Sequence, residues 1–330
     1  METSQYSELP ARTAELLQGS GPAAETLNAR LEHFASMQLR IPDKDGDSEV
    51  LDGVTFVHHF VKAPGDYDLI SWHYVEAGEG EPIVFLHGIP STWYMWHHQM
   101  AGLASTHRCI GVDLKGYGQS EKTPGDYTHE GAAEQLYAML LQIGVDKFNL
   151  VSHDRGTVQA DFIVAKHPNN ILRYGRGEQH LYHFNPSVAP QEEQFRNAPW
   201  TGIMEDPKRL VLWAYTWLAV LPIPDNEMIR IIQEWSYPDI SRSAQRYFLC
   251  STFRNEWLAR RRTLLKSWIC PVLIMQGFDS KTEPREWYEK AREYIPNSPG
   301  VLVDFLPGGH FWAQESPEET TGAIRKLLQM

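Results

Sequence analysis

The sequence predicts an α/β protein in which a mostly parallel sheet is flanked by helices and interrupted by an inserted all-helical lid. From about residue 82 onward, short apolar runs alternate with helical patterns, which is typical of a sheet covered on both faces. The alternation stops between about residues 186 and 265, where Trp, Tyr, Arg and Pro are frequent and the periodicity is helical. A chain of 330 residues is long enough for one large core and such an insertion.

Bulk composition narrows the range of partners and compartments. The formal net charge of −12 disfavours binding to nucleic acid or to an anionic membrane surface. No run of eighteen apolar residues occurs, and the N-terminus lacks a basic region followed by an apolar one. We therefore expect a cytoplasmic protein that neither spans a membrane nor is secreted.

Cysteines and paired histidines do not indicate a disulfide framework or a metal site. Cys109, Cys250 and Cys270 are odd in number and widely spaced among apolar residues, so we expect buried free thiols of a reducing compartment. The histidine pairs at 58–59 and 97–98 have no third ligand at metal spacing, and we expect surface or packing roles for them.

The first fifty or so residues are a polar extension with one predicted helix. Leu27, Leu31 and Phe34 recur at helical spacing, and we expect this helix to lie on the main body of the protein. The predicted organisation is an N-terminal extension (1–52), the first part of the core (53–185), the lid (186–265) and the second part of the core (266–330).

Strand and helix candidates follow from the length of each apolar run and from its periodicity. Short apolar runs bounded by turn residues predict buried strands, whereas spacings of three and four predict helices. A hairpin is expected first, turning at Pro64-Gly65-Asp66. In chain order, the predicted strands are 54–61, 68–77, 82–86, 109–114, 148–152, 272–276 and 301–305, and the helices include 132–143 and 159–166.

The most informative stretch runs from Phe148 to Thr157. An apolar strand ends in a polar tripeptide whose last residue is Asp154, Gly156 follows, and the continuation is helical. This is the layout of a strand–turn–helix elbow that presents a nucleophile at its apex. A carboxylate at the apex indicates attack on carbon through an alkyl-ester intermediate. An isolated Asp in this position could also be only a helix N-cap.

Two other segments carry groups that such chemistry needs. The backbone N–H of Ile89, in the motif that begins at His87, and that of Arg155 would form a two-donor oxyanion hole. His310 follows the last predicted strand, where a general base that activates water is expected. We assign His87, Ile89, Trp93 and Arg155 to the oxyanion hole and the substrate-binding group.

Four motifs together resemble those of one enzyme family. They are H-G-x-P at 87–90 with an aromatic stretch after it, D-x-x-G-Y-G-x-S at 113–120, H-D-x-G at 153–156 and G-G-H-F at 308–311. Over about residues 54–330 the chain resembles an α/β-hydrolase of the epoxide hydrolase and dehalogenase branch, and most of all an epoxide hydrolase. The resemblance implies the α/β-hydrolase fold with a helical lid and an Asp nucleophile.

Epoxide hydrolases use two lid tyrosines that hydrogen-bond the epoxide oxygen. The first usually lies seven residues before a lid proline, which matches Tyr215 and Pro222. The second falls some twenty residues before the proline that opens the penultimate strand, and Tyr247 lies close to that distance from Pro271. Each tyrosine taken alone could instead be an aromatic residue packed in a Trp-rich lid.

The dehalogenases of this branch match the chain less well. Haloalkane dehalogenases hold the halide with an Asn and a Trp at the positions of Ile89 and Arg155. Fluoroacetate dehalogenases resemble the chain at 153–156, but their second arginine corresponds to Val158, and their lid His is missing near Tyr215. Arg155 could bind a substrate carboxylate or form a salt bridge under the lid.

The acid that orients His310 is the least regular part of the pattern. It commonly follows the penultimate strand, three residues after its glycine, but this position is Ser280, and Asp279 is one residue short. Some dehalogenases take the acid ten residues after a helix-ending proline, which gives Glu178 when counted from Pro168. Because serine cannot stabilise an imidazolium as a carboxylate does, we prefer Glu178 to Asp279. Either carboxylate could instead pair with an arginine in its loop.

These features predict an epoxide hydrolase for a small to medium apolar oxirane. Asp154 would open the ring while Tyr215 and Tyr247 hold the oxygen, and water activated by His310 would cleave the ester. Two alternatives stay open: a haloacid-type dehalogenase with the same Asp–His machinery, and a non-hydrolytic binding protein on this fold. The expected partners are the substrate and water, without a metal or organic cofactor, and a homodimer is one assembly that the sequence permits.

Overall fold

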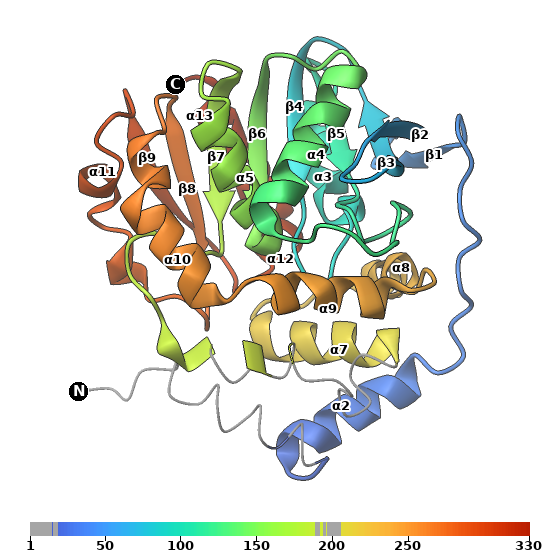
Figure 1. The fold of residues 1–330 in the computed structure, drawn as a ribbon. Helices are drawn as coiled ribbons and strands as arrows, with labels where there is room; N and C mark the ends of the chain where they lie inside the picture. Colours follow the sequence, from blue (N-terminus) through green and yellow to red (C-terminus); the bar gives the residue numbers. More distant parts are fainter. Residues whose placement is uncertain (1–14, 16–18, 189–191, 194–195, 197–205) are drawn as a thin grey trace, which may run out of the picture.

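The computed structural model describes residues 15, 19–188, 192–193, 196 and 206–330 (Figure 1). Within these residues the core is a nine-stranded sheet in the order β1-β2-β3-β5-β4-β6-β7-β8-β9. The pairs from β1 to β5 along this order are antiparallel, and all later pairs are parallel, which confirms the predicted fold class. The strands are β1 (Ser48–Leu51), β2 (Val54–Pro64), β3 (Leu69–Ala77), β4 (Glu81–Leu86), β5 (His107–Val112), β6 (Phe148–His153), β7 (Ile171–Gly177), β8 (Val272–Gly277) and β9 (Val301–Leu306).

Strand β7 lies between β6 and β8, although its sequence was too polar for it to stand out as a buried strand. Its two arginines are neutralised by partners on neighbouring elements. Arg176 is fully buried and forms an ion pair of 3.2 Å with Asp161 on the adjoining helix. Arg173 lies 3.3 Å from Glu81 at the start of β4. The strand is therefore buried together with its counter-charges.

Two helical layers cover the sheet. Helices α4 (His129–Gln142) and α5 (Asp154–Lys166) pack together and lie in front of the sheet in Figure 1. Helices α3 (His97–Leu103) and α13 (Pro317–Leu328) pack together on the opposite face. Helix α4 begins where the Thr128 side chain accepts a hydrogen bond from the N–H of Gly131, a local N-cap. Two short helices, α11 (Ala291–Tyr294) and α12 (Trp312–Glu315), complete the C-terminal part of the core.

The described part of the predicted lid is all-helical. Its helices lie below the sheet in Figure 1, across the carboxyl ends of the parallel strands, where ligands bind in open α/β sheets. Helix α7 starts with a proline directly after Asp206, whose side chain caps the N–H of Lys208. The lid helices are α7 (Pro207–Leu218), α8 (Asp225–Trp235), α9 (Ile240–Cys250) and α10 (Phe253–Arg262).

The N-terminal extension contributes helix α2 (Pro22–His33), which lies along lid helix α7 (Figure 1). Leu27 and Phe34, two residues of the predicted apolar stripe, are buried. Arg30 donates a hydrogen bond to the Thr216 hydroxyl at 3.0 Å. Helix α2 therefore lies on the outer face of the lid. The first strand of the sheet begins at Ser48, within the predicted N-terminal extension.

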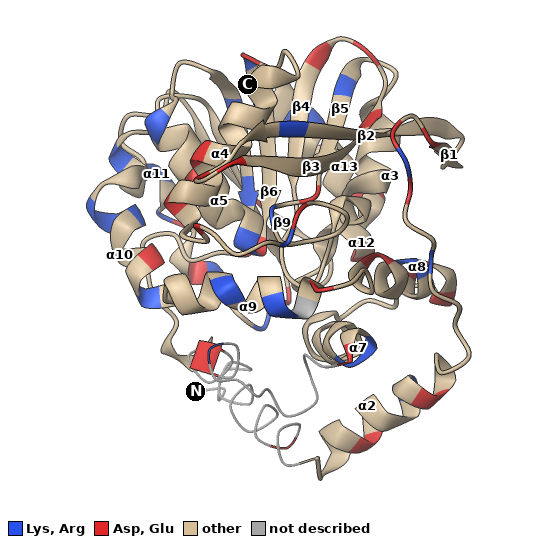
Figure 2. Ribbon diagram, turned by 45° about the vertical axis from the view of Figure 1, so that its right-hand side comes forward, with Lys and Arg blue, Asp and Glu red and all other residues tan. Residues whose placement is uncertain are grey.

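Acidic and basic residues are interspersed over the helices and loops in Figure 2. Cys109 and Cys270 are buried free thiols, as expected, but Cys250 at the end of α9 is exposed because this helix leaves its last turn uncovered. Within the described residues, no helix is both long and apolar enough to cross a membrane.

Candidate active site

Asp154 lies at the tight turn between β6 and α5. Its φ of 49° falls in the left-handed region, which is strained for a residue with a side chain. Two glycines make room for this turn. A Cβ atom on Gly156 would lie 2.3 Å from the carbonyl oxygen of His87, and one on Gly88 would lie 2.4 Å from the Asp154 side chain. The close approach of these loops thus holds the carboxylate in place.

The Asp154 carboxylate contacts the loop after β4. The N–H of Ile89 donates a hydrogen bond to its Oδ1 atom, at 2.8 Å. Arg155 is the second residue of α5, and N–H groups in the first turn of a helix have no acceptor within it. Both backbone donors expected for an oxyanion hole therefore adjoin Asp154.

His310 lies between two carboxylates. Its Nε2 atom is 3.8 Å from Oδ2 of Asp154, and its Nδ1 atom is 3.0 Å from Oε2 of Glu178. The carboxylate oxygen that faces the imidazole is therefore not the one that is bonded to Ile89. The three side chains form a row in the order carboxylate, imidazole, carboxylate, which is the arrangement of a nucleophile, a base and an orienting acid.

Glu178, the acid preferred from the sequence, is held by several donors. The N–H of Gly277 donates to Oε1 at 2.8 Å, and the hydroxyl of Ser280 donates to Oε2 at 2.7 Å. Ser280 occupies the more common acid position and here serves as a donor to the acid. Asp279 is exposed, because the loop turns its side chain toward solvent. The structure thus brings Glu178, and not Asp279, to His310.

Electrostatics favour the charged form of His310. Burial alone would lower its pKa, but the hydrogen bond and charge of Glu178, followed by the charge of Asp154, raise the pKa above its ordinary value. The adjacent His153 stays neutral, since burial and the charge of His310 lower its pKa to about 4. The neutral His153 ring donates a hydrogen bond from Nε2 to the His310 carbonyl at 2.7 Å.

Glu315, on α12, fixes the loop that carries His310 and was not identified from the sequence. Its carboxylate accepts hydrogen bonds from the N–H groups of Gly309 and Phe311, each at 3.0 Å. It also accepts bonds from the N–H groups of residues 220–221, which follow lid helix α7. The signal in the sequence is only an acidic residue after a histidine loop, a pattern too common to be informative.

A cavity opens to solvent beside these groups, with about 750 Å³ of empty space when its open mouth is included. Asp154, Glu178 and His310 contribute polar atoms to its wall. The remaining lining is mostly apolar, and much of it comes from the lid, which suits a small to medium apolar ligand. The described apolar residues in the lining are Ile89, Pro90, Val188, Leu210, Trp213, Ala214, Leu218, Phe248 and Phe253.

Neither lid tyrosine is among the described residues that line this cavity. Tyr215 donates its hydroxyl to the side chain of Gln314, and Tyr247 donates its hydroxyl to the Lys115 carbonyl at 2.7 Å. On α7 the two residues before Tyr215 line the cavity, and each further residue rotates by about 100° around the helix. In the described structure both hydroxyls are therefore bonded away from the cavity lining, and both rings pack in the lid and core interface.

His87 and Trp93 also lie outside the cavity lining. The buried His87 ring donates from Nδ1 to the next carbonyl and accepts the N–H of Leu114 at Nε2, at 3.1 Å. Burial lowers the pKa of His87, so the ring is neutral. The backbone N–H of Trp93 donates to Asp113 at 3.0 Å. Both residues therefore support the loop that presents Ile89, from behind the described cavity wall.

The Arg155 side chain forms a salt bridge under the lid. Its guanidinium donates to both carboxylate oxygens of Glu256 on α10, one of them at 2.9 Å, and lies over the Phe248 and Phe253 rings. His129 lies 2.9 Å from the same carboxylate. Burial would raise the pKa of Glu256, but the charges of Arg155 and His129 lower it well below its ordinary value. This cluster joins the nucleophile elbow to the lid.

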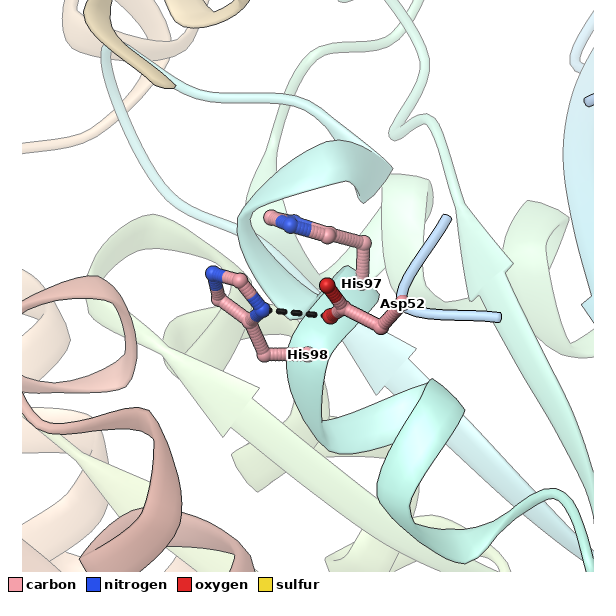
Figure 3. A group of neighbouring side chains, drawn as sticks. All are labelled: Asp52, His97 and His98. Carbon is pink, nitrogen blue, oxygen red and sulfur yellow. Dashed lines mark hydrogen bonds and ion pairs between the residues drawn. The ribbon is translucent and has the colours of Figure 1, made fainter. Parts of the chain in front are cut away.

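Away from this site, one group of described residues has the chemistry of metal ligands (Figure 3). Asp52, in the turn after β1, lies beside His97 and His98 at the start of α3, with one ligand atom of each within 4.8 Å of the others. The histidines therefore do have a third neighbour, which is distant in the sequence. His98 is hydrogen-bonded to Asp52 at 2.5 Å, and the centroids of the two imidazole rings lie 3.8 Å apart at an interplanar angle of 39°. Because Asp52 and His98 already satisfy each other through this hydrogen bond, we assign no ion to this group.

Comparison with known proteins agrees with this architecture. The family model described as the alpha/beta hydrolase fold matches residues 81–174. An epoxide hydrolase from Vigna radiata superposes with a TM-score of 0.67 at 21% identity, covering 83% of this chain and 98% of that one. Cfl2 from Burkholderia cenocepacia gives a TM-score of 0.69 at 21% identity, with 82% and 95% covered. The chain is therefore an α/β-hydrolase-fold protein.

Curated relatives narrow the comparison within that fold. Epoxide hydrolase 2 from Siraitia grosvenorii is 33% identical over 122 residues, which are 36% of this chain and 39% of the relative. Bifunctional epoxide hydrolase 2 from Rattus norvegicus is 31% identical over 126 residues, 37% of this chain and 23% of the relative. The match thus spans less than half the length of these relatives. A fluoroacetate dehalogenase from Burkholderia sp. is 24% identical over 282 residues, 77% of this chain and 89% of the relative. Over the matched third of its length, the chain is therefore similar in sequence to epoxide hydrolases.

Proposed function

We propose that the protein is an epoxide hydrolase that opens an oxirane through an alkyl ester on Asp154. The observation that carries the proposal is the row of Asp154, His310 and Glu178 beside a mostly apolar cavity. A carboxylate nucleophile paired with an imidazole base suits substitution at carbon followed by hydrolysis of the resulting ester. The similarity to epoxide hydrolases supports an oxirane as the substrate.

In the first step, the Asp154 carboxylate attacks an epoxide carbon from the side opposite the C–O bond. That bond breaks, the freed oxygen takes a proton, and a hydroxyalkyl ester remains on the enzyme. Oδ2 is the better candidate for the attacking atom, because Oδ1 already accepts the N–H of Ile89 at 2.8 Å.

In the second step, His310 removes a proton from water, and the resulting hydroxide adds to the ester carbonyl carbon. Negative charge develops on Oδ1, which faces the N–H of Ile89, while Glu178 stabilises the imidazolium. Collapse of this intermediate breaks the bond to the alkoxide, which takes the proton from His310 and leaves as a diol. Asp154 then loses its proton and is again a carboxylate.

A dehalogenase acting on haloacids is the second candidate. It is favoured by the alignment with the fluoroacetate dehalogenase, which extends over 77% of this chain. Such a substrate needs a cation for its carboxylate, and the Arg155 guanidinium in the cavity wall is already paired with Glu256. This pairing makes the epoxide the better candidate.

The test is a paired assay of the wild type and Asp154→Ala on small aryl epoxides, with free halide measured on haloacetates in parallel. We expect diol from the wild type and none from the variant, whereas Asp279→Ala, which alters an exposed carboxylate near the site, should keep the activity. A single turnover in ¹⁸O-labelled water should place the label in Asp154. Halide without diol would support the dehalogenase instead. If the wild type formed neither diol nor halide, both functions would be refuted.

A further inference from the structure

Opening of an oxirane leaves an alkoxide that needs a proton donor within the cavity. The hydroxyls of Tyr215 and Tyr247 are bonded to Gln314 and to the Lys115 carbonyl, outside the cavity lining. A donor therefore has to be sought among the other polar groups of the wall. Two titratable residues of the described lining have no part in the steps above, namely His180 and Glu283.

His180 and Glu283 come from the loops after neighbouring strands β7 and β8, which also carry Glu178 and Ser280. Nε2 of His180 lies 3.3 Å from Oε1 of Glu283, and each side chain is only 4% exposed. The two groups form a contacting pair in the wall of the same cavity as Asp154 and His310. Both are thus within a compartment that a substrate of Asp154 would fill.

The cations near this pair are balanced by another carboxylate. Arg176 and Arg260 form ion pairs with Asp161 at 3.2 and 2.7 Å, respectively. The hydroxyl of Tyr288 donates to the Gln179 carbonyl at 3.0 Å. The Glu283 side chain is thus buried against His180, beside arginines whose charge Asp161 offsets, and this environment favours its neutral carboxylic acid form.

Electrostatics support the same assignment. Burial and the nearby charge of Glu178 raise the pKa of Glu283 well above its ordinary value, against the opposing effects of the Tyr288 hydroxyl and of Arg260 and Arg176. Burial and the charge of Arg260 lower the pKa of His180 to about 3. The surroundings of the pair therefore favour a protonated carboxyl group on Glu283 and a neutral imidazole on His180. The charged or titratable groups that act on the pair are Arg155, Arg176, Glu178, Glu256, Arg260 and Tyr288.

We propose that Glu283 is a catalytic acid for ring opening, positioned by His180, and that it takes the role expected of the lid tyrosines. This inference rests on the proposed function. As Asp154 attacks carbon, the epoxide C–O bond breaks, and its oxygen takes the proton of the Glu283 carboxyl group. Glu283 is left as a carboxylate. The proton that Asp154 releases when the diol has formed returns to Glu283 through solvent, so the cycle balances.

The test separates formation of the ester from its hydrolysis. Wild type, Glu283→Gln and the control Glu289→Gln, an exposed position nearby, are mixed with styrene oxide and quenched on the millisecond scale. Mass spectrometry of the peptide that carries Asp154 then follows the ester. Gln keeps the size of Glu but cannot give up a proton. We expect ester formation to slow about 100-fold in Glu283→Gln, with hydrolysis and the control changed by less than about threefold.

A second measurement tests the protonation of Glu283 in the wild type, with folded Glu283→Gln as the reference. The infrared spectrum at neutral pH should contain a protonated-carboxyl band that Glu283→Gln removes. The rate of ester formation should fall as pH rises through the elevated pKa of Glu283, and this limb should vanish in the variant. An unchanged rate of ester formation in folded Glu283→Gln would overturn the proposal, as would a missing band. Absence of any ester in the wild type would instead refute the proposed function itself.

Discussion

His310 is hydrogen-bonded to Glu178, with Nδ1 and Oε2 3.0 Å apart, across the ends of two strands that are not neighbours in the chain. The acid therefore comes from the loop after β7. The position after β8, where this branch commonly carries the acid, holds Ser280, whose hydroxyl donates to Glu178 at 2.7 Å. The loop after β7 thus supplies the carboxylate beside His310, and the loop after β8 supplies a hydroxyl that donates to this carboxylate.

Replacement of Glu178 should impair the second chemical step. In Glu178→Gln the imidazolium of His310 loses its stabilising charge, so ester hydrolysis should slow by about 10³- to 10⁴-fold. The ester on Asp154 should then accumulate and be visible by intact-protein mass spectrometry. Asp279→Asn is the matched control and should hydrolyse the ester at the wild-type rate. Equal losses in both variants would contradict the assignment of the acid.

The rate of ester hydrolysis should depend on the protonation of His310. Only the neutral imidazole can take a proton from water, and its pKa is raised by Glu178 and Asp154. The rate should therefore fall as pH decreases through a pKa above the ordinary histidine value. Glu178→Gln should move this acid limb to lower pH. Protonation of His310 also stabilises the fold at low pH, and this contribution is lost as pH rises through its raised pKa. Single-turnover hydrolysis measured over a pH series gives this acid limb of the rate profile. An acid limb that stays at the same pH in Glu178→Gln would contradict the effect of the Glu178 charge on the pKa of His310.

Removing the charge of only one partner of the buried Arg155–Glu256 pair should destabilise the fold. Glu256→Gln leaves the Arg155 cation buried without its carboxylate, and the free energy of unfolding should fall by about 3 to 5 kcal/mol. The double variant Arg155→Met with Glu256→Gln should recover part of this loss. Urea unfolding of the set gives the coupling energy. A loss below about 1 kcal/mol in the single variant would show that the pair is not buried in solution.

Removal of the hydroxyls of the two lid tyrosines should have little effect on the rates of the chemical steps. Tyr215→Phe and Tyr247→Phe each remove one hydrogen bond away from the cavity, so a cost of about 1 kcal/mol in stability is expected. The rate of ester formation with an aryl epoxide should stay within about threefold of the wild type. A loss of two orders of magnitude in either variant would mean that its hydroxyl turns into the cavity when substrate binds.

Gly88 should be intolerant of a side chain. A Cβ atom there would lie 2.4 Å from the Asp154 side chain, so Gly88→Ala must displace the carboxylate from its place beside Ile89. A displacement of this kind should lower the rate of ester formation by at least about 100-fold. Gly322→Ala is the control, because nothing lies within 4 Å of its added Cβ atom. Wild-type turnover in Gly88→Ala would show that the elbow relaxes more easily than its packing suggests.

The sequence by itself determined the fold class and the position of Asp154, the proposed nucleophile, at the turn after a strand. Both depend on local patterns: apolar runs mark the parallel strands, and a strand that ends at Asp154 before a glycine and a helix marks the elbow. His310 and Ile89 could be named for the same reason, since each directly follows a strand of the sheet. Parallel strands bring such loops to one edge of the sheet whatever the details of packing.

Only the tertiary structure decided which side chains meet at that edge. From the sequence, Glu178 and Asp279 were both candidates for the acid. The direction of the loops brings Glu178 to His310 and turns Asp279 toward solvent. The tyrosines had the expected spacing, but the rotation of each lid helix against the core directs their hydroxyls elsewhere. The contact of His180 with Glu283 joins two loops about a hundred residues apart. Such outcomes depend on long-range packing, which residue spacing along one chain does not encode.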